Sequence, residues 1–180
     1  MLNSKQILEE GLLKLENSYG KPAQVGYDLS LKEVKQIGIQ DGWDKETSTY
    51  LPEKIGKILK DKTELTNYHP ISLFKLDGVE GWLLYPGVYD ITFHEGCKIP
   101  ANRAAFIKQR SSLKRNGASI SSPVFDPGFE TENMGTVMDV RETIFIEKDA
   151  RVAQMYFHEV EPVEELYNGQ WQGDKQRKNQ

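Results

Sequence analysis

The spacing of apolar residues predicts one amphipathic helix at the start of the chain. In residues 4–17, apolar side chains recur at close to helical intervals, which places them on one face of a helix. Ser4 is a candidate N-cap, and a Tyr-Gly-Lys-Pro sequence soon after Asn17 ends the segment. We expect this helix to pack on the body of the protein rather than to carry chemistry.

The rest of the chain has the alternating pattern of short β-strands. Apolar and polar residues alternate over short stretches separated by Gly, Pro and Asp-Gly turn signals. The expected strands cover residues 24–34, 71–76, 81–84, 88–93, 104–107, 135–146 and 151–158. Many short strands with regularly spaced turns favour a mainly β fold, either a barrel or a distorted jelly-roll-like body. Residues 36–65 break this pattern, and we expect an irregular excursion there with a short helix over residues 53–59.

Length and composition favour one globular domain. The chain has 180 residues, of which 28% are charged and 38% hydrophobic, and its net charge is −4. This charge argues against a general nucleic-acid binder, and no apolar run approaches the roughly 20 residues that span a bilayer. Acidic residues near the N-terminus argue against a secretion signal. The single cysteine, Cys97, excludes an internal disulfide, so a cytoplasmic location is expected.

Residues 110–130 form the polar, turn-rich stretch that holds the candidate chemistry. The stretch begins with Arg-Ser-Ser-Leu-Lys-Arg-Asn-Gly and contains Asp-Pro-Gly-Phe-Glu at its end. Its composition argues against a core strand or helix. Arg110 and Arg115 offer guanidinium donors that match phosphate oxygens, and Ser111 and Ser112 add short-range hydroxyls. On composition alone, a basic surface loop followed by an ordinary turn is an equally good interpretation.

The order of these residues is more specific than their composition. The pattern Arg-Ser-Ser-Leu-x-Arg-x-Gly, followed at short range by Asp-Pro-Gly-Phe, resembles the second and third motifs of the dUTPase and dCTP deaminase superfamily. Gly-Tyr-Asp-Leu at 26–29 resembles the first motif, and Arg-Val-Ala-Gln-Met at 151–155 resembles the fourth. The resemblance extends over residues 24–173. It implies the family's β-clip fold in a single domain, residues 1–173.

The resemblance implies that several of these residues bind a triphosphate. The segment from Arg110 to Arg115 would bind the phosphates, and Gln154 would approach the nucleotide from a strand. Asp28 would hold the water shell of a Mg²⁺ ion that accompanies the triphosphate. In this family the ligand sits between the subunits of a homotrimer. An acidic residue at the edge of a surface strand is the alternative interpretation of Asp28.

In the same resemblance, the Asp-Pro-Gly-Phe turn implies a hydrolase. Asp126 falls on the position of the acid that activates a water for attack on the phosphate chain. Phe129 falls on the position of an aromatic residue that stacks under deoxyribose and crowds out a ribose 2′-hydroxyl. The implied reaction is hydrolysis of dUTP to dUMP and pyrophosphate. The alternative for residues 126–128 is a plain turn.

Enzymes of the deaminase branch of the family catalyse the attack of water on cytosine C4 without zinc. They use a Glu on the strand after this turn. An ungapped alignment places Thr136 at that position, and a threonine cannot shuttle the proton. A gapped alignment places Asp139 there, and both registers fit a strand. The single cysteine and the histidines His69, His94 and His158 lack the spacing of zinc ligands. We expect these histidines to lie at the surface or at an interface.

The C-terminal segment resembles the deaminase branch. Tyr167 and the Gly-Gln-Trp-Gln-Gly sequence after it resemble the family's Tyr…Gly-Lys-Tyr-Gln-Gly, with Gln replacing Lys and Trp171 replacing Tyr. Residues 161–173 are therefore expected to order over the bound triphosphate as a lid, with Trp171 and Gln172 in contact with it. A buried anchor is the alternative role of Trp171. Residues 174–180 lack apolar side chains and are expected to be disordered.

The sequence leaves three functions open. A dUTP diphosphatase is favoured by Asp126 and by the lack of a Glu at the ungapped deaminase position. A zinc-independent dCTP deaminase, with or without dUTPase activity, is the alternative that the tail supports. The departures from the family pattern also motivate a third function, a regulator that binds the nucleotide without turning it over.

Overall fold

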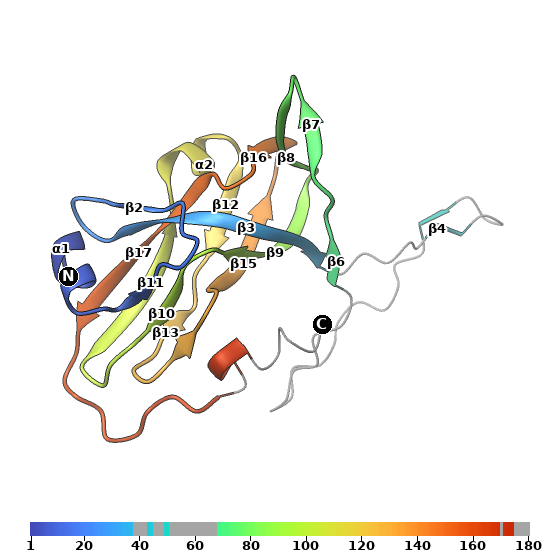
Figure 1. Ribbon diagram of the computed structural model, residues 1–180. Coiled ribbons are helices and arrows are strands. Elements are labelled where there is room, and N and C mark those ends of the chain that lie inside the picture. Colours follow the sequence, from blue (N-terminus) through green and yellow to red (C-terminus); the bar gives the residue numbers. More distant parts are fainter. Residues whose placement is uncertain (38–42, 45–48, 51–67, 170, 175–180) are drawn as a thin grey trace.

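The computed structural model describes residues 1–37, 43–44, 49–50, 68–169 and 171–174 (Figure 1). The helix expected over residues 53–59 and residues 175–180 of the expected disordered tail lie outside this part of the chain. The described helices are short: α1 (Ser4–Glu9), α2 (Ser111–Arg115) and the 3-10 turn η1 (Gln172–Asp174). Among the described residues, none of these helices has the length and apolar character needed to cross a bilayer. The prediction of a mainly β fold is confirmed.

A nine-stranded antiparallel sheet forms the body of the protein. Its strands pair in the order β12 (Ala118–Ser121), β15 (Gly135–Val140), β9 (Gly87–Phe93), β3 (Tyr27–Ile37), β17 (Arg151–Glu159), β11 (Arg103–Gln109) and β13 (Val124–Phe125), while β2 (Lys21–Pro22) and β6 (Tyr68–Pro70) add to β3. Figure 1 shows this sheet strongly twisted. Its central strands β3 and β17 carry the first and fourth motifs side by side, with Asp28 opposite Gln154 in the register.

The remaining described strands form three smaller sheets. They pair β1 (Leu13–Lys14) with β10 (Gly96–Lys98) and β14 (Glu130–Thr131), β16 (Ile144–Glu147) with β8 (Val79–Leu84) and β7 (Phe74–Leu76), and β4 (Trp43–Asp44) with β5 (Thr49–Tyr50). The β7–β8 hairpin projects from the body (Figure 1). It turns at Asp77 and Gly78, whose φ angles are 49° and 85°. An Asp-Gly pair suits a hairpin turn of positive φ, so the turn expected here is confirmed.

The N-terminal helix is shorter than the sequence predicts. Its N-cap is Asn3 and not Ser4, because the Asn3 side chain accepts a hydrogen bond from the Gln6 amide and the Gln6 side chain accepts one from the Asn3 amide. The helix ends before Gly11, whose φ of 63° is a left-handed conformation that glycine adopts freely. Leu13, which the helical spacing includes, belongs instead to strand β1.

Three of the expected strands have clearly different limits in the structure. The strand expected over 71–76 begins only at Phe74. The strand expected over 24–34 begins only at Tyr27, after Gly26 with a φ of 77°. The strand expected over 135–146 is divided into β15 and β16, which belong to different sheets. Between them the Arg141 amide donates to the Gly117 carbonyl at 2.9 Å. This contact extends the pairing of β15 with β12 by one residue, and the chain leaves the main sheet after it.

The polar stretch 110–130 is more regular than its composition suggests. It contains α2, β12 and β13. Leu113, Ala118 and Ile120 are buried, and the last two alternate with polar residues along β12. The prediction that this stretch forms no core strand or helix is therefore wrong, because a few apolar residues at the right spacing anchor short elements.

Side chains of β3 alternate between the two faces of the strand, and this alternation determines which of them can reach the site. Leu29 and Leu31 are fully buried in the core. Asp28 and Ser30 point to the opposite face of the strand, since successive side chains alternate. Both are nevertheless buried. Buried polar groups are almost always hydrogen-bonded, so this second face of β3 must be covered by polar partners.

Candidate functional site

Helix α2 presents the predicted phosphate-binding donors at the surface. Arg110 is its N-cap, and the Arg110 amide donates to a carbonyl of β17 at 2.9 Å. The side chain of Leu113 is buried in the core and attaches the helix to the body of the protein. Ser111, Ser112 and Arg115 are exposed, and their side chains bond to no other described residue. The donors are thus held on a fixed turn while their polar atoms face solvent.

Asp28 lies between two arginines. Its Oδ2 atom is 3.1 Å from Nη1 of Arg151 and 3.5 Å from Nε of Arg110. Arg110 Nη1 also donates to the Arg151 carbonyl at 3.1 Å. The structure therefore brings together Asp28 and Arg110, both predicted site residues, and adds Arg151. The sequence offered a signal for Arg151, because it opens the strand of the fourth motif, but its side chain was assigned no role.

Gln154 is hydrogen-bonded within its own chain. Its Nε2 atom donates to the Val25 carbonyl at 2.8 Å, and its Oε1 atom accepts a hydrogen bond from the Tyr156 hydroxyl. Burial, and then the negative charge of Asp28, raise the pKa of Tyr156. The Tyr156 hydroxyl is therefore protonated at neutral pH and orients the Gln154 amide, which lies beside Asp28 in the strand pairing.

The turn at Asp126 is fixed by backbone hydrogen bonds, but its carboxylate is not. The Phe129 amide donates to the Asp126 carbonyl at 3.0 Å, and the Gly128 amide donates to the Ile99 carbonyl at 2.8 Å. Gly128 has a φ of 91°, and a Cβ there would collide with Leu166 and the following backbone. The Asp126 side chain is exposed and bonds to no described residue. The carboxylate thus extends from a fixed turn and is available to a ligand.

The C-terminal segment lies along this same turn. The Tyr167 amide donates to the Pro127 carbonyl at 2.8 Å, and the ring of Tyr167 meets that of Phe129 edge to face at 5.5 Å. The Gln172 side chain accepts a hydrogen bond from the Glu130 amide at 3.1 Å and donates to the Gly128 carbonyl at 2.9 Å. Segment 161–173 thus contacts the predicted catalytic turn of its own chain.

Trp171 is not a buried anchor in the described part of the chain. It is 37% exposed. Its amide makes a long hydrogen bond of 3.4 Å to the Tyr167 hydroxyl. The alternative of a buried Trp171 is therefore wrong for the isolated chain, and the indole remains accessible to a ligand.

Thr136 and Asp139 point to opposite faces of β15. Thr136 is buried, and its hydroxyl donates to the Ser121 carbonyl of the neighbouring strand β12. The Asp139 side chain is 44% exposed and lies 3.4 Å from Arg141. Because the two residues differ by three positions on one strand, a ligand on one face of β15 meets at most one of them.

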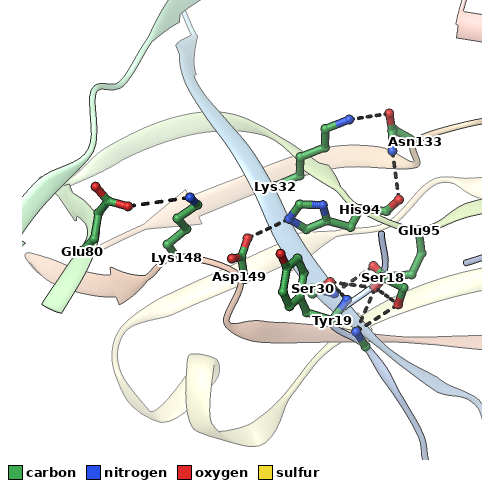
Figure 2. Close-up of polar contacts among 11 residues, drawn as sticks. Ser18, Tyr19, Ser30, Lys32, Glu80, His94, Glu95, Asn133, Lys148 and Asp149 are labelled. Atoms are coloured by element: carbon green, nitrogen blue, oxygen red, sulfur yellow. Dashed lines mark hydrogen bonds and ion pairs between the residues drawn. The ribbon is translucent and has the colours of Figure 1, made fainter. Parts of the chain in front are cut away.

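Glu95 is a buried carboxylate that no sequence pattern indicated. It is 0% exposed. Its oxygens accept hydrogen bonds from the Ser18 hydroxyl, the Gly20 amide, and both the amide and the hydroxyl of Ser30, at 2.5–3.0 Å. Figure 2 shows these contacts where segment 18–20 crosses β3. Glu95 thus ties the N-terminal segment to the strand that carries Asp28.

His94 belongs to this polar region and not to the open surface. Its Nε2 atom lies 2.8 Å from Oδ1 of Asp149, and the Tyr19 ring meets the imidazole edge to face at 5.0 Å (Figure 2). The His94 side chain is 15% exposed. The expectation of a surface or interface position stays a prediction for this partly exposed residue, and the side chain of His69 lies outside the described residues.

The described residues contain no group of three or more His, Cys, Asp and Glu side chains that could ligate a metal ion. The predicted metal contact, Asp28, is 11% exposed and shares one oxygen with two guanidinium groups. Its Oδ1 atom makes no hydrogen bond with a described residue. This environment fits one water-mediated contact to an ion that phosphate oxygens hold, and does not fit a metal site built by protein ligands alone.

Comparisons with known proteins agree with the motifs. The family model described as dCTP deaminase-like matches residues 6–160. The probable deoxyuridine 5′-triphosphate nucleotidohydrolase of Methanosarcina mazei is 31% identical over 168 residues, which cover 89% of this chain and 87% of the relative. The probable enzyme of the same name from Methanococcoides burtonii is 37% identical over 153 residues, covering 83% and 79%.

A further relative matches this chain over fewer residues but with a higher sequence identity. The deoxyuridine 5′-triphosphate nucleotidohydrolase of Methanocaldococcus jannaschii is 40% identical over 113 residues, which cover 63% of this chain and 70% of the relative. Among solved structures, the 2′-deoxycytidine 5′-triphosphate deaminase from Agrobacterium tumefaciens aligns with a TM-score of 0.61 and 17% identity. The alignment covers 89% of this chain and 47% of that protein, so the chain spans about half its length. This likeness supports the fold.

Proposed function

Because the chain belongs to the dUTPase and dCTP deaminase superfamily, we propose that it is a dUTP diphosphatase that hydrolyses dUTP to dUMP and pyrophosphate. The observation that carries the proposal is the Asp126 carboxylate, which is exposed and without a side-chain partner among the described residues on a turn fixed by its backbone. The similarity to relatives named deoxyuridine 5′-triphosphate nucleotidohydrolases supports this substrate.

The phosphate chain is bound by the donors at α2. Arg110 and Arg115 neutralise phosphate oxygens, and the hydroxyls of Ser111 and Ser112 donate hydrogen bonds to them. These side chains are exposed or partly exposed and lie on one short turn, so they can converge on a single triphosphate. Gln154 lies beside Asp28 next to this turn and contacts the nucleotide from β17.

Asp126 acts as the general base. It takes a proton from a water molecule, whose oxygen forms a bond to the α-phosphorus. The bond from this phosphorus to the bridging α–β oxygen breaks, and pyrophosphate leaves with the bonding electrons. Phe129 packs under the deoxyribose, so a 2′-hydroxyl is excluded by lack of space.

Magnesium accompanies the triphosphate as its counterion. When bound, it neutralises charge on the phosphate oxygens and on the leaving pyrophosphate. Asp28 is the residue that would hold its water shell, and its Oδ1 atom would be the one available, since Oδ2 is occupied by the arginines. No other described acidic residue joins Asp28 in a metal-ligating group.

Segment 161–173 acts as a lid over the bound nucleotide. Trp171, which is 37% exposed, packs on the nucleotide, while Gln172 keeps the segment attached to the backbone of the catalytic turn. The protein acts as a homotrimer in the cytoplasm, with active sites shared between subunits. Each subunit supplies one domain, residues 1–173.

A dCTP deaminase is the second candidate, favoured by the tail sequence and by the description of the matching family model. Asp139 would then be the proton shuttle, because the Thr136 hydroxyl donates to a backbone carbonyl and carries no ionisable group. A third function, nucleotide binding without turnover, requires the same donors at α2 but not the base.

Product analysis distinguishes the candidates. The protein is incubated with Mg²⁺ and either dUTP or dCTP, and the nucleotides are separated by chromatography. We expect dUMP and pyrophosphate from dUTP and no uracil nucleotide from dCTP. Uracil nucleotides from dCTP would support the deaminase, and binding of a non-hydrolysable dUTP analogue without turnover of either nucleotide would support the regulator.

A further inference from the structure

The carboxylate of Asp28 joins two strands that meet beside the phosphate-binding turn. Arg151 is the first residue of β17 and pairs with Ser30 of β3, and the register shifts just after it. Arg110 follows β11 directly, and its amide is bonded to β17. Both arginine side chains are directed at Asp28, which reaches them from β3 with 11% of its side chain exposed.

The two arginines share this carboxylate unequally. Charge-assisted N–H···O⁻ hydrogen bonds are typically about 2.7–2.9 Å long. The Arg151 contact of 3.1 Å is near this range, whereas the Arg110 contact of 3.5 Å is clearly longer. Arg110 is oriented mainly by its hydrogen bond to the Arg151 carbonyl. Its guanidinium therefore keeps most of its charge and donors for another anion.

Two guanidinium groups and one carboxylate leave an excess of one positive charge beside α2. The Asp28 carboxylate is nearly buried and needs a cation, since an uncompensated buried charge is strongly unfavourable. If Arg151 were lost, Arg110 would be the single remaining cation paired with Asp28 among the described residues. The carboxylate would then draw Arg110 away from the triphosphate.

We propose that Arg151 is a positioning residue which, by occupying the Asp28 carboxylate, keeps Arg110 available to bind the triphosphate. The inference rests on the phosphate-binding role proposed above for Arg110. It assigns Asp28 a second role, as the shared anchor of the two arginines, and it gives Arg151 an effect on nucleotide affinity without a contact to the nucleotide.

A double-mutant cycle tests this role. Affinity for a non-hydrolysable dUTP analogue is measured by calorimetry in EDTA, so that the proposed water-mediated contact of Asp28 to magnesium plays no part. Arg151→Ala is expected to weaken binding at least about tenfold, the scale of one lost charge-assisted contact. Adding Asp28→Asn to that variant removes the competing charge, so binding should recover to near the parent value.

Lys148→Ala is the matched control. Lys148 pairs with Glu80 at 3.7 Å, and its side chain is 48% exposed. Loss of this surface cation should leave the affinity unchanged. Thermal unfolding of every variant is recorded, and Arg151→Gln, which keeps much of the side-chain length without the charge, takes the place of Arg151→Ala if the alanine variant does not fold.

The outcomes separate this inference from the proposed function. Unchanged affinity in Arg151→Ala, or weakened affinity that Asp28→Asn does not restore, would overturn it; the second result would mean that Arg151 contacts the phosphates itself. If the parent protein binds the analogue but does not hydrolyse dUTP, the diphosphatase proposal is wrong. The affinities of the double-mutant cycle still test the role of Arg151. A parent that does not bind the analogue even in the presence of Mg²⁺ would reject both.

Discussion

Glu95 and Asp126 are both carboxylates in short connections between strands, yet their surroundings are opposite. Glu95 is fully buried and accepts hydrogen bonds from Ser18, Gly20 and Ser30 (Figure 2). Asp126 is exposed, and its side chain bonds to no residue in the described part of the chain. The backbone around Asp126 is nevertheless as well bonded as that around Glu95.

The difference separates a structural carboxylate from one available for chemistry. A carboxylate whose lone pairs are all used by fixed donors stabilises the fold and cannot readily take a proton from water. A carboxylate on a rigid turn with free lone pairs can do so. The Glu95 cluster also fixes β3 at Ser30, next to Asp28, so it supports the strand that carries Asp28.

The largest effect is expected from Asp126→Asn. The substitution removes the proposed base while the fixed turn remains, so dUTP turnover should fall roughly 10²- to 10⁴-fold. Binding of a non-hydrolysable dUTP analogue should change little, because Asp126 is not a phosphate donor. Turnover and binding are measured on the same preparation. Unchanged turnover would remove Asp126 from the mechanism.

The next largest effect is expected from Glu95→Ala, on stability. The substitution leaves the buried Ser30 amide, and the hydroxyls of Ser30 and Ser18, without their acceptor, so the free energy of unfolding should fall by roughly 3 kcal/mol. Glu16→Ala is the control, because Glu16 is exposed in the same region and its side chain has no described partner. Chemical denaturation of both variants gives the comparison. Equal stability would show that the Glu95 cluster does not hold the fold.

A smaller effect is expected from Arg115→Ala. Loss of one charge-assisted contact should weaken triphosphate binding about tenfold. Lys114→Ala is the matched control, since Lys114 is an exposed cation on the same helix at a position that the family motif leaves variable. Calorimetry with the dUTP analogue measures both. If the two variants lost the same affinity, α2 would act through its general charge and not through the motif.

The smallest effect is expected from Lys14→Met. A hydrogen bond from Lys14 is the main cause that lowers the pKa of Glu130, against an opposing effect of burial. Burial disfavours the Lys14 cation, but hydrogen bonds to Glu130 and Glu132 raise its pKa overall. The pairs are partly exposed, so the variant should lose at most about 1 kcal/mol of stability at pH 7.

The pH dependence of this loss has a defined sign. A lowered carboxylate pKa contributes stability above the ordinary value of 4.5 that is lost as the pH falls through the folded-state pKa. A raised lysine pKa contributes stability below 10.5 that is lost at higher pH. Denaturation curves of Lys14→Met and the parent should therefore converge in acid. A difference that persists in acid would mean that Lys14 acts through packing and not through its charge.

Local pattern predicted much of the fold. The strands at 88–93, 104–107 and 151–158 correspond closely to β9, β11 and β17, because their alternation reflects one buried face. The helix predicted over 4–17 is longer than the observed helix, because Leu13 fits a helical spacing as well as it fits strand β1. Only tertiary pairing with β10 decides between them.

Site residues that share one motif could be predicted from the sequence. Contacts between residues far apart in the sequence could not. The donors on α2 are neighbours in sequence, so their pattern was visible. Arg151 and Asp28 are 123 positions apart, and Glu95 and Ser30 are 65 apart. No local pattern signals such pairs, because strand order brings them together.

The central claim, that Asp126 directs water to the α-phosphorus of dUTP, is tested most directly by hydrolysis in ¹⁸O-labelled water. Mass spectrometry locates the label in the products of dUTP and, in a parallel reaction, of dCTP. The account predicts label in the phosphate of dUMP and no labelled base. Label in pyrophosphate, or in a uracil base formed from dCTP, would contradict it, the latter by showing that water attacks C4 as in a deaminase.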